Sequence, residues 1–167
     1  MLKPVLFLAA AAASAALFAP EFFERLVERG PSATATQLVD PAASTSTARI
    51  AADGNGHYVT DVQVNGRSLA AIVDTGASLV TLRYEDARAL GIVFPGDRFD
   101  IAVQTANGPG RARQVRLRSV RLGSITLNDV DALVVDQGAL GTNLLGMSFL
   151  KRLSRYEVRG STLVLER

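Results

Sequence analysis

One short segment, Ala71-Ile72-Val73-Asp74-Thr75-Gly76-Ala77-Ser78, constrains this chain more than any other. Its three leading apolar residues are typical of a buried strand, and they deliver a carboxylate onto a tight turn. A carboxylate at such a place is costly unless it is hydrogen-bonded. Gly76 allows backbone N–H groups to approach Asp74, and Ser78 offers a hydroxyl donor. The segment therefore predicts a buried strand that ends at a held carboxylate.

Residues 49–167 are predicted to form one all-β domain. Short apolar runs alternate with turn signals such as Asn65-Gly66 and Arg159-Gly160-Ser161. Only two segments, 84–90 and 147–153, have the pattern of short helices. Many short strands with close turns favour a barrel or a sandwich. The expected strands are 57–64, 68–73, 99–105, 111–122, 125–127, 132–135, 156–158 and 162–165.

The N-terminal part of the chain differs from this domain. Residues 1–20 contain an alanine-rich apolar run after Lys3, whose length is at the low edge for a membrane span. A basic start, an apolar core and small residues also fit a signal peptide. We expect an uncleaved apolar helix, with the remaining chain across the membrane because the positive charges precede the run. Residues 21–48 are charged and then rich in Pro, Ser, Thr and Ala, which indicates a linker.

Composition excludes several kinds of chemistry. The chain has no Cys and a single His, so a disulfide framework, a thiol nucleophile and the usual zinc sites are not expected. His57 is expected to be structural, and no metal or organic cofactor is implied. The formal net charge of +2 does not by itself indicate a nucleic-acid partner. Five arginines are expected to form a solvated strand face rather than a site for acidic substrates, lipid headgroups or nucleic acid: Arg111, Arg113, Arg116, Arg118 and Arg121.

A second apolar segment, Asn143-Leu144-Leu145-Gly146-Met147, completes a recognisable pair. With it the chain resembles the retropepsin-like aspartic proteases, in particular the single-domain, membrane-anchored type of proteobacteria. In that family, a loop of two apolar residues followed by Asp-Thr/Ser-Gly-Ala is crossed by a later strand that ends in two apolar residues and Gly. This chain has both motifs, in that order. The resemblance covers roughly residues 50–167.

The resemblance implies a closed retropepsin-like β-barrel with one or two short helices. It implies an aspartic endopeptidase in which Asp74 is catalytic. It also implies that the catalytic domain lies in the periplasm and is tethered to the inner membrane by a single span. If the first segment is cleaved, the domain is instead expected to be secreted. The residues implied to support the active site are Thr75, Gly76, Ala77, Ser78, Leu145 and Gly146. The residues implied to form a flap over the substrate are Gln104, Thr105, Ala106, Asn107 and Gly108, although Asn107 also suits a simple turn.

Aspartic protease chemistry needs two facing carboxylates that share one proton. The ionised carboxylate deprotonates a water molecule, and the protonated one polarises the scissile carbonyl. This chain has one Asp-Thr-Gly, because Asp136-Gln137-Gly138 lacks the hydroxyl residue. The second carboxylate is therefore expected from Asp74 of another copy, in a two-fold symmetric homodimer acting on a protein or peptide.

Three alternatives stay open. The chain could be a non-catalytic binding or assembly module that keeps this fold at the membrane. It could be a monomeric enzyme that uses Asp136 as the second carboxylate. Asp74-Thr75-Gly76 could also be an ordinary connection between a strand and a turn.

Overall fold

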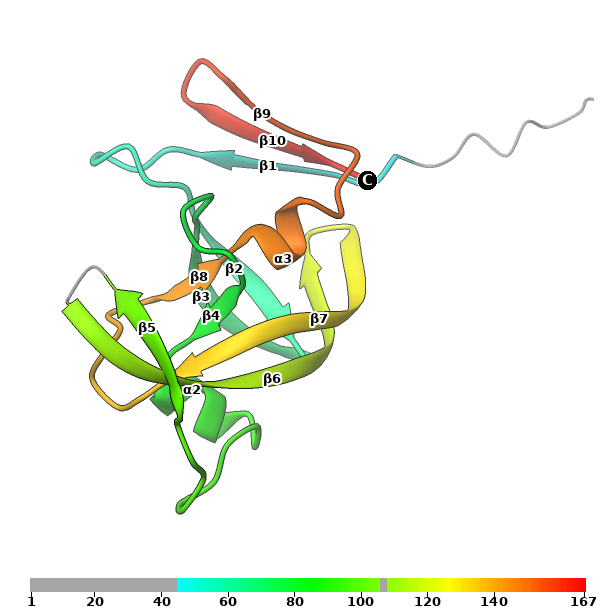
Figure 1. The fold of residues 1–167 in the computed structure, drawn as a ribbon. Coiled ribbons are helices and arrows are strands. Elements are labelled where there is room, and N and C mark those ends of the chain that lie inside the picture. Colours follow the sequence, from blue (N-terminus) through cyan, green and yellow to red (C-terminus); the bar gives the residue numbers. More distant parts are fainter. Residues whose placement is uncertain (1–44, 106–107) are drawn as a thin grey trace, which may run out of the picture. The chain divides into compact units, whose positions relative to one another are not determined.

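The structure, a computed structural model, describes residues 45–105 and 108–167 (Figure 1). The predicted apolar helix of residues 1–20 and the predicted linker up to residue 44 lie outside these ranges. Within the described ranges, no helix has the length and apolar character needed to cross a membrane.

Ten strands and two short helices follow one another along the described residues. The first strands are β1 (Thr47–Ala51), β2 (Val59–Val64), β3 (Arg67–Val73) and β4 (Val80–Leu82), followed by helix α2 (Tyr84–Ala89). Next come β5 (Ile101–Thr105), β6 (Gly108–Leu122), β7 (Ile125–Val135) and β8 (Asn143–Leu145). Helix α3 (Met147–Leu150), β9 (Arg155–Arg159) and β10 (Thr162–Glu166) complete the domain.

A closed barrel forms the centre of this domain. Its strand order is β2-β3-β8-β4-β7-β6, and a further pairing of β2 with β6 closes the circle. β5 pairs with the far end of β6, so the hairpin of β5 and β6 extends from the barrel (Figure 1). The core of the described domain is apolar and contains side chains of the barrel strands, of α3 and of β10; the largest fully buried ones are Phe149, Leu82, Leu117, Ile125, Leu127, Leu145, Leu150 and Leu165. The all-β barrel predicted from the sequence is confirmed.

A separate three-stranded antiparallel sheet contains both ends of the domain. Its order is β1-β10-β9, which Figure 1 shows as three stacked strands. β10 is the central strand, since Leu163 pairs with Ile50 of β1 on one side and with Val158 of β9 on the other.

Several predicted elements differ from the observed ones. Segments 125–127 and 132–135 are one continuous strand, because β6 pairs along it without a change of register and leaves only Arg118 and Asp129 unpaired. Asp129 adopts a positive φ of 51° there. The helix predicted for 147–153 ends at Leu150. β1 and β4 were not predicted, because five and three residues with little alternation give a weak signal.

A buried asparagine joins the barrel to helix α2. Asn143 is 3% exposed and opens β8. Its Nδ2 donates to the carbonyl of Ala70 and to Oδ2 of Asp86, both at 2.8 Å, and its Oδ1 accepts the N–H of Arg83 at 2.9 Å. One side chain thus fixes β3, β8 and the start of α2 relative to one another.

We predict that Asn143→Ala lowers the free energy of unfolding by about 1 to 3 kcal/mol, because it removes the three hydrogen bonds of a buried amide. Urea unfolding of the two proteins measures the difference. Asn128→Ala is the matched control, since Asn128 is exposed, and its effect is expected within about 0.5 kcal/mol. Equal destabilisation by the two substitutions would contradict the assigned role.

Candidate active site

Asp74 lies at the carboxyl end of β3, where β3 runs parallel to β8. The register pairs Val73 with Leu145, and the Asp74 N–H donates to the carbonyl of Leu145 at 3.2 Å. Leu145 itself is fully buried, and Asp74 is half-buried. The two motifs singled out in the sequence are therefore adjacent, and the backbone of one positions the carboxylate of the other.

The turn after Asp74 holds its carboxylate. Oδ1 of Asp74 accepts the N–H of Gly76 at 2.8 Å, and the Ala77 N–H donates to the Asp74 carbonyl at 3.4 Å. A Cβ on residue 76 would lie 3.1 Å from the same Oδ1, so glycine fits this position best. The hydrogen bond from the Gly76 N–H to the Asp74 carboxylate, which the sequence predicts, is present. Thr75 and Ser78 are exposed, and neither hydroxyl hydrogen-bonds to any residue that the structure describes.

Gly146 lies where β8 leaves the barrel past this turn. A Cβ on residue 146 would come within 2.3 Å of the Leu79 carbonyl oxygen and 2.7 Å of the Ala77 carbonyl oxygen. Only glycine allows so close an approach of two backbone segments. The next N–H, of Met147, donates to the Ala77 carbonyl at 2.8 Å, and the Ser148 hydroxyl accepts the Val80 N–H at 2.9 Å. The crossing therefore fixes both sides of the loop.

A cavity of about 700 Å³ opens beside the Asp74 carboxylate. The hairpin of β5 and β6 borders it through Val103, Gln104 and Thr105, and the Thr105 hydroxyl donates to the Gly108 carbonyl at 2.9 Å. Of the predicted flap, Ala106 and Asn107 lie outside the described residues. Among the described residues that line the cavity, Asp74 is the only charged one; the others include Ala77, Ser78, Leu79, Thr81, Leu133, Val135, Ala139, Leu140, Thr142 and Leu144.

Several of these lining residues were not singled out in the sequence. Leu133 and Val135 belong to β7, and Leu140 and Thr142 to the loop before β8. Leu133 and Val135 alternate with the core residues Ala132 and Val134, so they lie on the other face of β7, and the sequence does not say that this face borders a cavity. Only the pairing of β7 with β4 and β6 places them near Asp74.

Asp136 has a structural role. Its Oδ1 accepts the Arg111 N–H at 3.1 Å, and its own N–H donates to the Arg111 carbonyl at 2.9 Å. The Asp136 carbonyl accepts the Ala139 N–H at 3.2 Å. These contacts join the end of β7 to the β5–β6 hairpin, and Asp136 is not among the residues lining the cavity. This geometry agrees with the interpretation of Asp136 as a loop residue.

The carboxylate of Asp97 also contacts the β5–β6 hairpin. It forms an ion pair with Arg113 of β6. The pKa of the Asp97 carboxyl is lowered chiefly by the Phe94 N–H, which donates to its Oδ2. Burial opposes this effect less strongly, and the hydrogen bond and charge of Arg113 lower the pKa further. Arg116 is paired with Asp131, and Arg111, Arg116, Arg118 and Arg121 are exposed, as expected of a solvated face.

His57 is exposed in a turn, where its N–H donates to Asp53 at 2.8 Å. No group of three or more His, Cys, Asp or Glu side chains within 45–105 and 108–167 is arranged to hold a metal ion.

The chain resembles known proteins over this whole region. Residues 60–152 match the family described as "gag-polyprotein putative aspartyl protease". The chain is 38% identical over 111 residues to an uncharacterized protein of Sinorhizobium sp, a match that covers 66% of this chain and 48% of that protein. It is 35% identical over 116 residues to an uncharacterized protein of Rickettsia prowazekii, with 70% and 49% covered. The chain thus spans about half the length of these curated relatives.

A solved structure extends the comparison to the fold. The crystal structure of a retropepsin-like aspartic protease from Rickettsia conorii superposes with a TM-score of 0.65 at 31% sequence identity. The match covers 73% of this chain and 91% of that one.

We predict that Gly146→Ala destabilises the domain by about 1 to 3 kcal/mol or more, because the new methyl group would overlap two carbonyl oxygens. This is the usual cost of forcing extra atoms into a packed site. Thermal or urea unfolding measures the loss. Gly54→Ala is the control, since a Cβ there meets no atom within 4 Å. A Gly146→Ala protein as stable as the control would show that the crossing tolerates a side chain.

Proposed function

Because the chain belongs to the retropepsin-like aspartic protease family, we propose that it is an aspartic endopeptidase in which Asp74 is one half of a catalytic dyad. The observation that carries the proposal is the position of the Asp74 carboxylate. It is held by the Gly76 N–H, and it is the only charged group among the described residues around a cavity of about 700 Å³. A carboxylate fixed beside an apolar cavity is suited to acid–base chemistry on a bound chain.

The second carboxylate comes from Asp74 of another copy. Asp136 is bound to the backbone of Arg111 and does not line the cavity, so the described residues offer no second carboxylate within one chain. A two-fold axis beside Asp74 would place two such carboxylates face to face, sharing one proton. The proposed enzyme is therefore a homodimer with one active site for two chains.

The dyad then hydrolyses a peptide bond in two stages. The ionised carboxylate removes a proton from a water molecule, whose oxygen forms a bond to the scissile carbonyl carbon. The protonated carboxylate gives its proton to the carbonyl oxygen, which produces a neutral diol. As the diol collapses, one of its hydroxyls gives its proton to the carboxylate that gave up its own proton in the first stage, and the other carboxyl group gives its proton to the amide nitrogen. The C–N bond then breaks, and a carboxylic acid and an amine leave.

The substrate is an extended polypeptide with apolar side chains next to the cleaved bond. The β5–β6 hairpin borders the cavity with exposed backbone, which can pair with an extended chain as another strand does. Leu79, Leu133 and Leu144 give the cavity apolar walls, which favour apolar substrate side chains over charged ones. In this proposal, the segment from Gln104 to Gly108 acts as the flap over the bound substrate.

The N-terminal segment anchors the enzyme. Residues 1–20 would cross the inner membrane once and leave the catalytic domain in the periplasm, tethered through residues 21–48. The support for this is the apolar run after Lys3 and its preceding positive charges.

We predict that Asp74→Asn reduces the rate of peptide cleavage by about 100-fold to 10,000-fold, the range that one acid–base group contributes. The assay uses a library of extended peptides from acidic to neutral pH. Asp136→Asn is the matched control and keeps its activity, because an amide oxygen can still accept the Arg111 N–H. Equal cleavage by wild type and Asp74→Asn, or none by either, contradicts the proposed activity. Loss of activity in both Asp74→Asn and Asp136→Asn would favour a monomeric enzyme that uses Asp136 as its second carboxylate.

Fractionation of cells tests the anchor separately. The full chain is expected in the membrane fraction and accessible to protease from the periplasm. A chain without residues 1–20 is expected to stay in the cytoplasm. If cells that express the full chain instead yield a shortened protein in the soluble periplasmic fraction, residues 1–20 act as a cleaved signal peptide.

A further inference from the structure

The last pair of the β6–β7 ladder is completed by a side chain. Backbone pairing of the two strands ends with Ala112 opposite Val135. In the next pair, the Asp136 N–H donates to the Arg111 carbonyl at 2.9 Å, as in a bonded antiparallel pair. The return bond differs, because the Arg111 N–H donates to Oδ1 of the Asp136 side chain at 3.1 Å. The carboxylate therefore takes the place of a backbone carbonyl.

This arrangement allows the chain to turn away directly after β7. The Asp136 carbonyl, which does not bind Arg111, accepts the Ala139 N–H at 3.2 Å and closes a turn. Gly138 has a φ of 78° within that turn, a value that glycine adopts without strain. The four residues from Ala139 to Thr142 all line the substrate cavity. Asp136 thus begins the loop that forms one wall of this cavity.

The same residue joins this wall to the β5–β6 hairpin. Gly110 of β6 pairs with Val103, which also lines the cavity. A Cβ on residue 110 would lie 3.5 Å from Oδ1 of Asp136. It would also lie 3.7 Å from the Ala139 Cβ and 3.8 Å from the Thr105 Cγ2. Figure 1 shows the loop between β7 and β8 beside this end of β6. The hairpin and the loop, which both border the cavity, therefore meet at Asp136.

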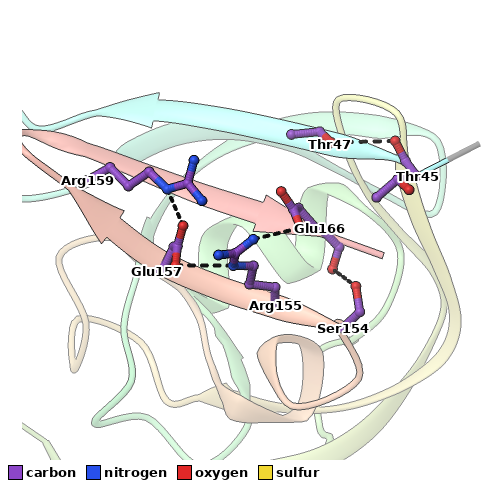
Figure 2. Close-up of polar contacts among 7 residues, drawn as sticks. All are labelled: Thr45, Thr47, Ser154, Arg155, Glu157, Arg159 and Glu166. Carbon is purple, nitrogen blue, oxygen red and sulfur yellow. Dashed lines mark hydrogen bonds and ion pairs between the residues drawn. The ribbon is translucent and has the colours of Figure 1, made fainter.

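The Asp136 carboxylate serves as a hydrogen-bond acceptor rather than as one half of an ion pair. The terminal sheet shows the contrast, since Glu157 lies between the side chains of Arg155 and Arg159 and pairs with both (Figure 2). Asp136 instead binds a backbone N–H, and no ion pair joins it to a lysine or arginine within 45–105 and 108–167. An asparagine oxygen can accept the same bond, whereas an alanine methyl group cannot.

We propose that Asp136 is a positioning residue for substrate binding, which holds the wall from residue 139 to residue 142 against the β5–β6 hairpin. The cavity is then formed before a polypeptide enters it. A wall that is not held has to be ordered by the substrate, and this ordering costs binding free energy. Leu140 and Val103 are apolar residues of the two joined segments, so a formed cavity favours apolar substrate side chains. This inference rests on the proposed function, because it concerns the polypeptide that Asp74 would cleave.

Two substitutions at residue 136 test this role in the full-length chain. Asp136→Ala removes the acceptor, and we expect the KM for an apolar peptide to rise about 10-fold, the weight of one hydrogen bond to a charged group, while kcat changes little. Asp136→Asn keeps the acceptor and is expected to keep the wild-type KM. Asp131→Ala is the matched control and is also expected to keep it, since this carboxylate of the same strand pairs with the Arg116 side chain and does not line the cavity.

Peptide binding to the Asp74→Asn chain measures the same effect without catalysis. The probe is a fluorescently labelled peptide of apolar residues, whose Kd is obtained from fluorescence anisotropy. Adding Asp136→Ala is expected to raise the Kd about 10-fold, and adding Asp136→Asn to leave it unchanged. Hydrogen exchange of residues 137–142 is expected to be faster in Asp136→Ala than in Asp136→Asn. If Asp136→Ala does not fold, Gly138→Ala strains the same turn at its positive φ and is expected to raise the Kd as well.

The outcomes separate this inference from the proposed enzyme. A chain whose Kd rises in Asp136→Ala but not in Asp136→Asn, and which cleaves no peptide, supports the positioning role and contradicts the activity. A chain that cleaves peptides with the same KM in Asp136→Ala and wild type supports the activity and overturns the role. An Asp136→Asn protein as impaired as Asp136→Ala also overturns it, because the charge and not the acceptor would then matter. Absence of peptide binding to the Asp74→Asn chain overturns it as well.

Discussion

The approach of Gly146 to the loop after Asp74 is the contact on which the rest of the site depends. Two backbone segments pass so closely there that a single methyl group would lie 2.3 Å from a carbonyl oxygen. The parallel pairing of β3 with β8 brings them together, and the Leu145 carbonyl and the Ala77 carbonyl accept N–H groups on either side of the crossing. Asp74 is therefore positioned by hydrogen bonds between backbone segments far apart in sequence, rather than by its own short turn alone.

The sequence was sufficient for the parts of the site that depend on local chemistry. Asp74 and Gly76 could be identified because a carboxylate directly after an apolar strand needs nearby donors. Gly146 was identified through the resemblance to the retropepsin-like family rather than from its local sequence. Asn143 and Leu133 show which features of the site could not be predicted from the sequence. The three hydrogen bonds of Asn143 reach residues of β3 and α2, and no local pattern indicates which distant groups a buried amide will meet. Leu133 borders the cavity only because β7 pairs with β4.

Ser78 shows how a local prediction can lose to the fold. Its hydroxyl is close enough in sequence to reach Asp74, yet the close approach of β8 fixes the loop with Ser78 exposed along the cavity and the Gly76 N–H on the carboxylate. In the proposed enzyme, this exposure leaves the Ser78 hydroxyl available to a bound substrate chain. The interpretation of Asp136 as a loop residue agrees with the structure; it rested on the absence of a hydroxyl residue, since Gln137 stands where Thr75 follows Asp74.

One domain of this size offers a single such carboxylate, and the proposed enzyme is complete only when two domains meet. The most direct test of this claim is the stoichiometry with a tight, peptide-like aspartic protease inhibitor, measured by titration calorimetry on the full-length protein. Half-sites from two chains predict one inhibitor bound for every two chains, with the complex sedimenting as a dimer. One inhibitor bound to each monomeric chain would contradict the shared dyad.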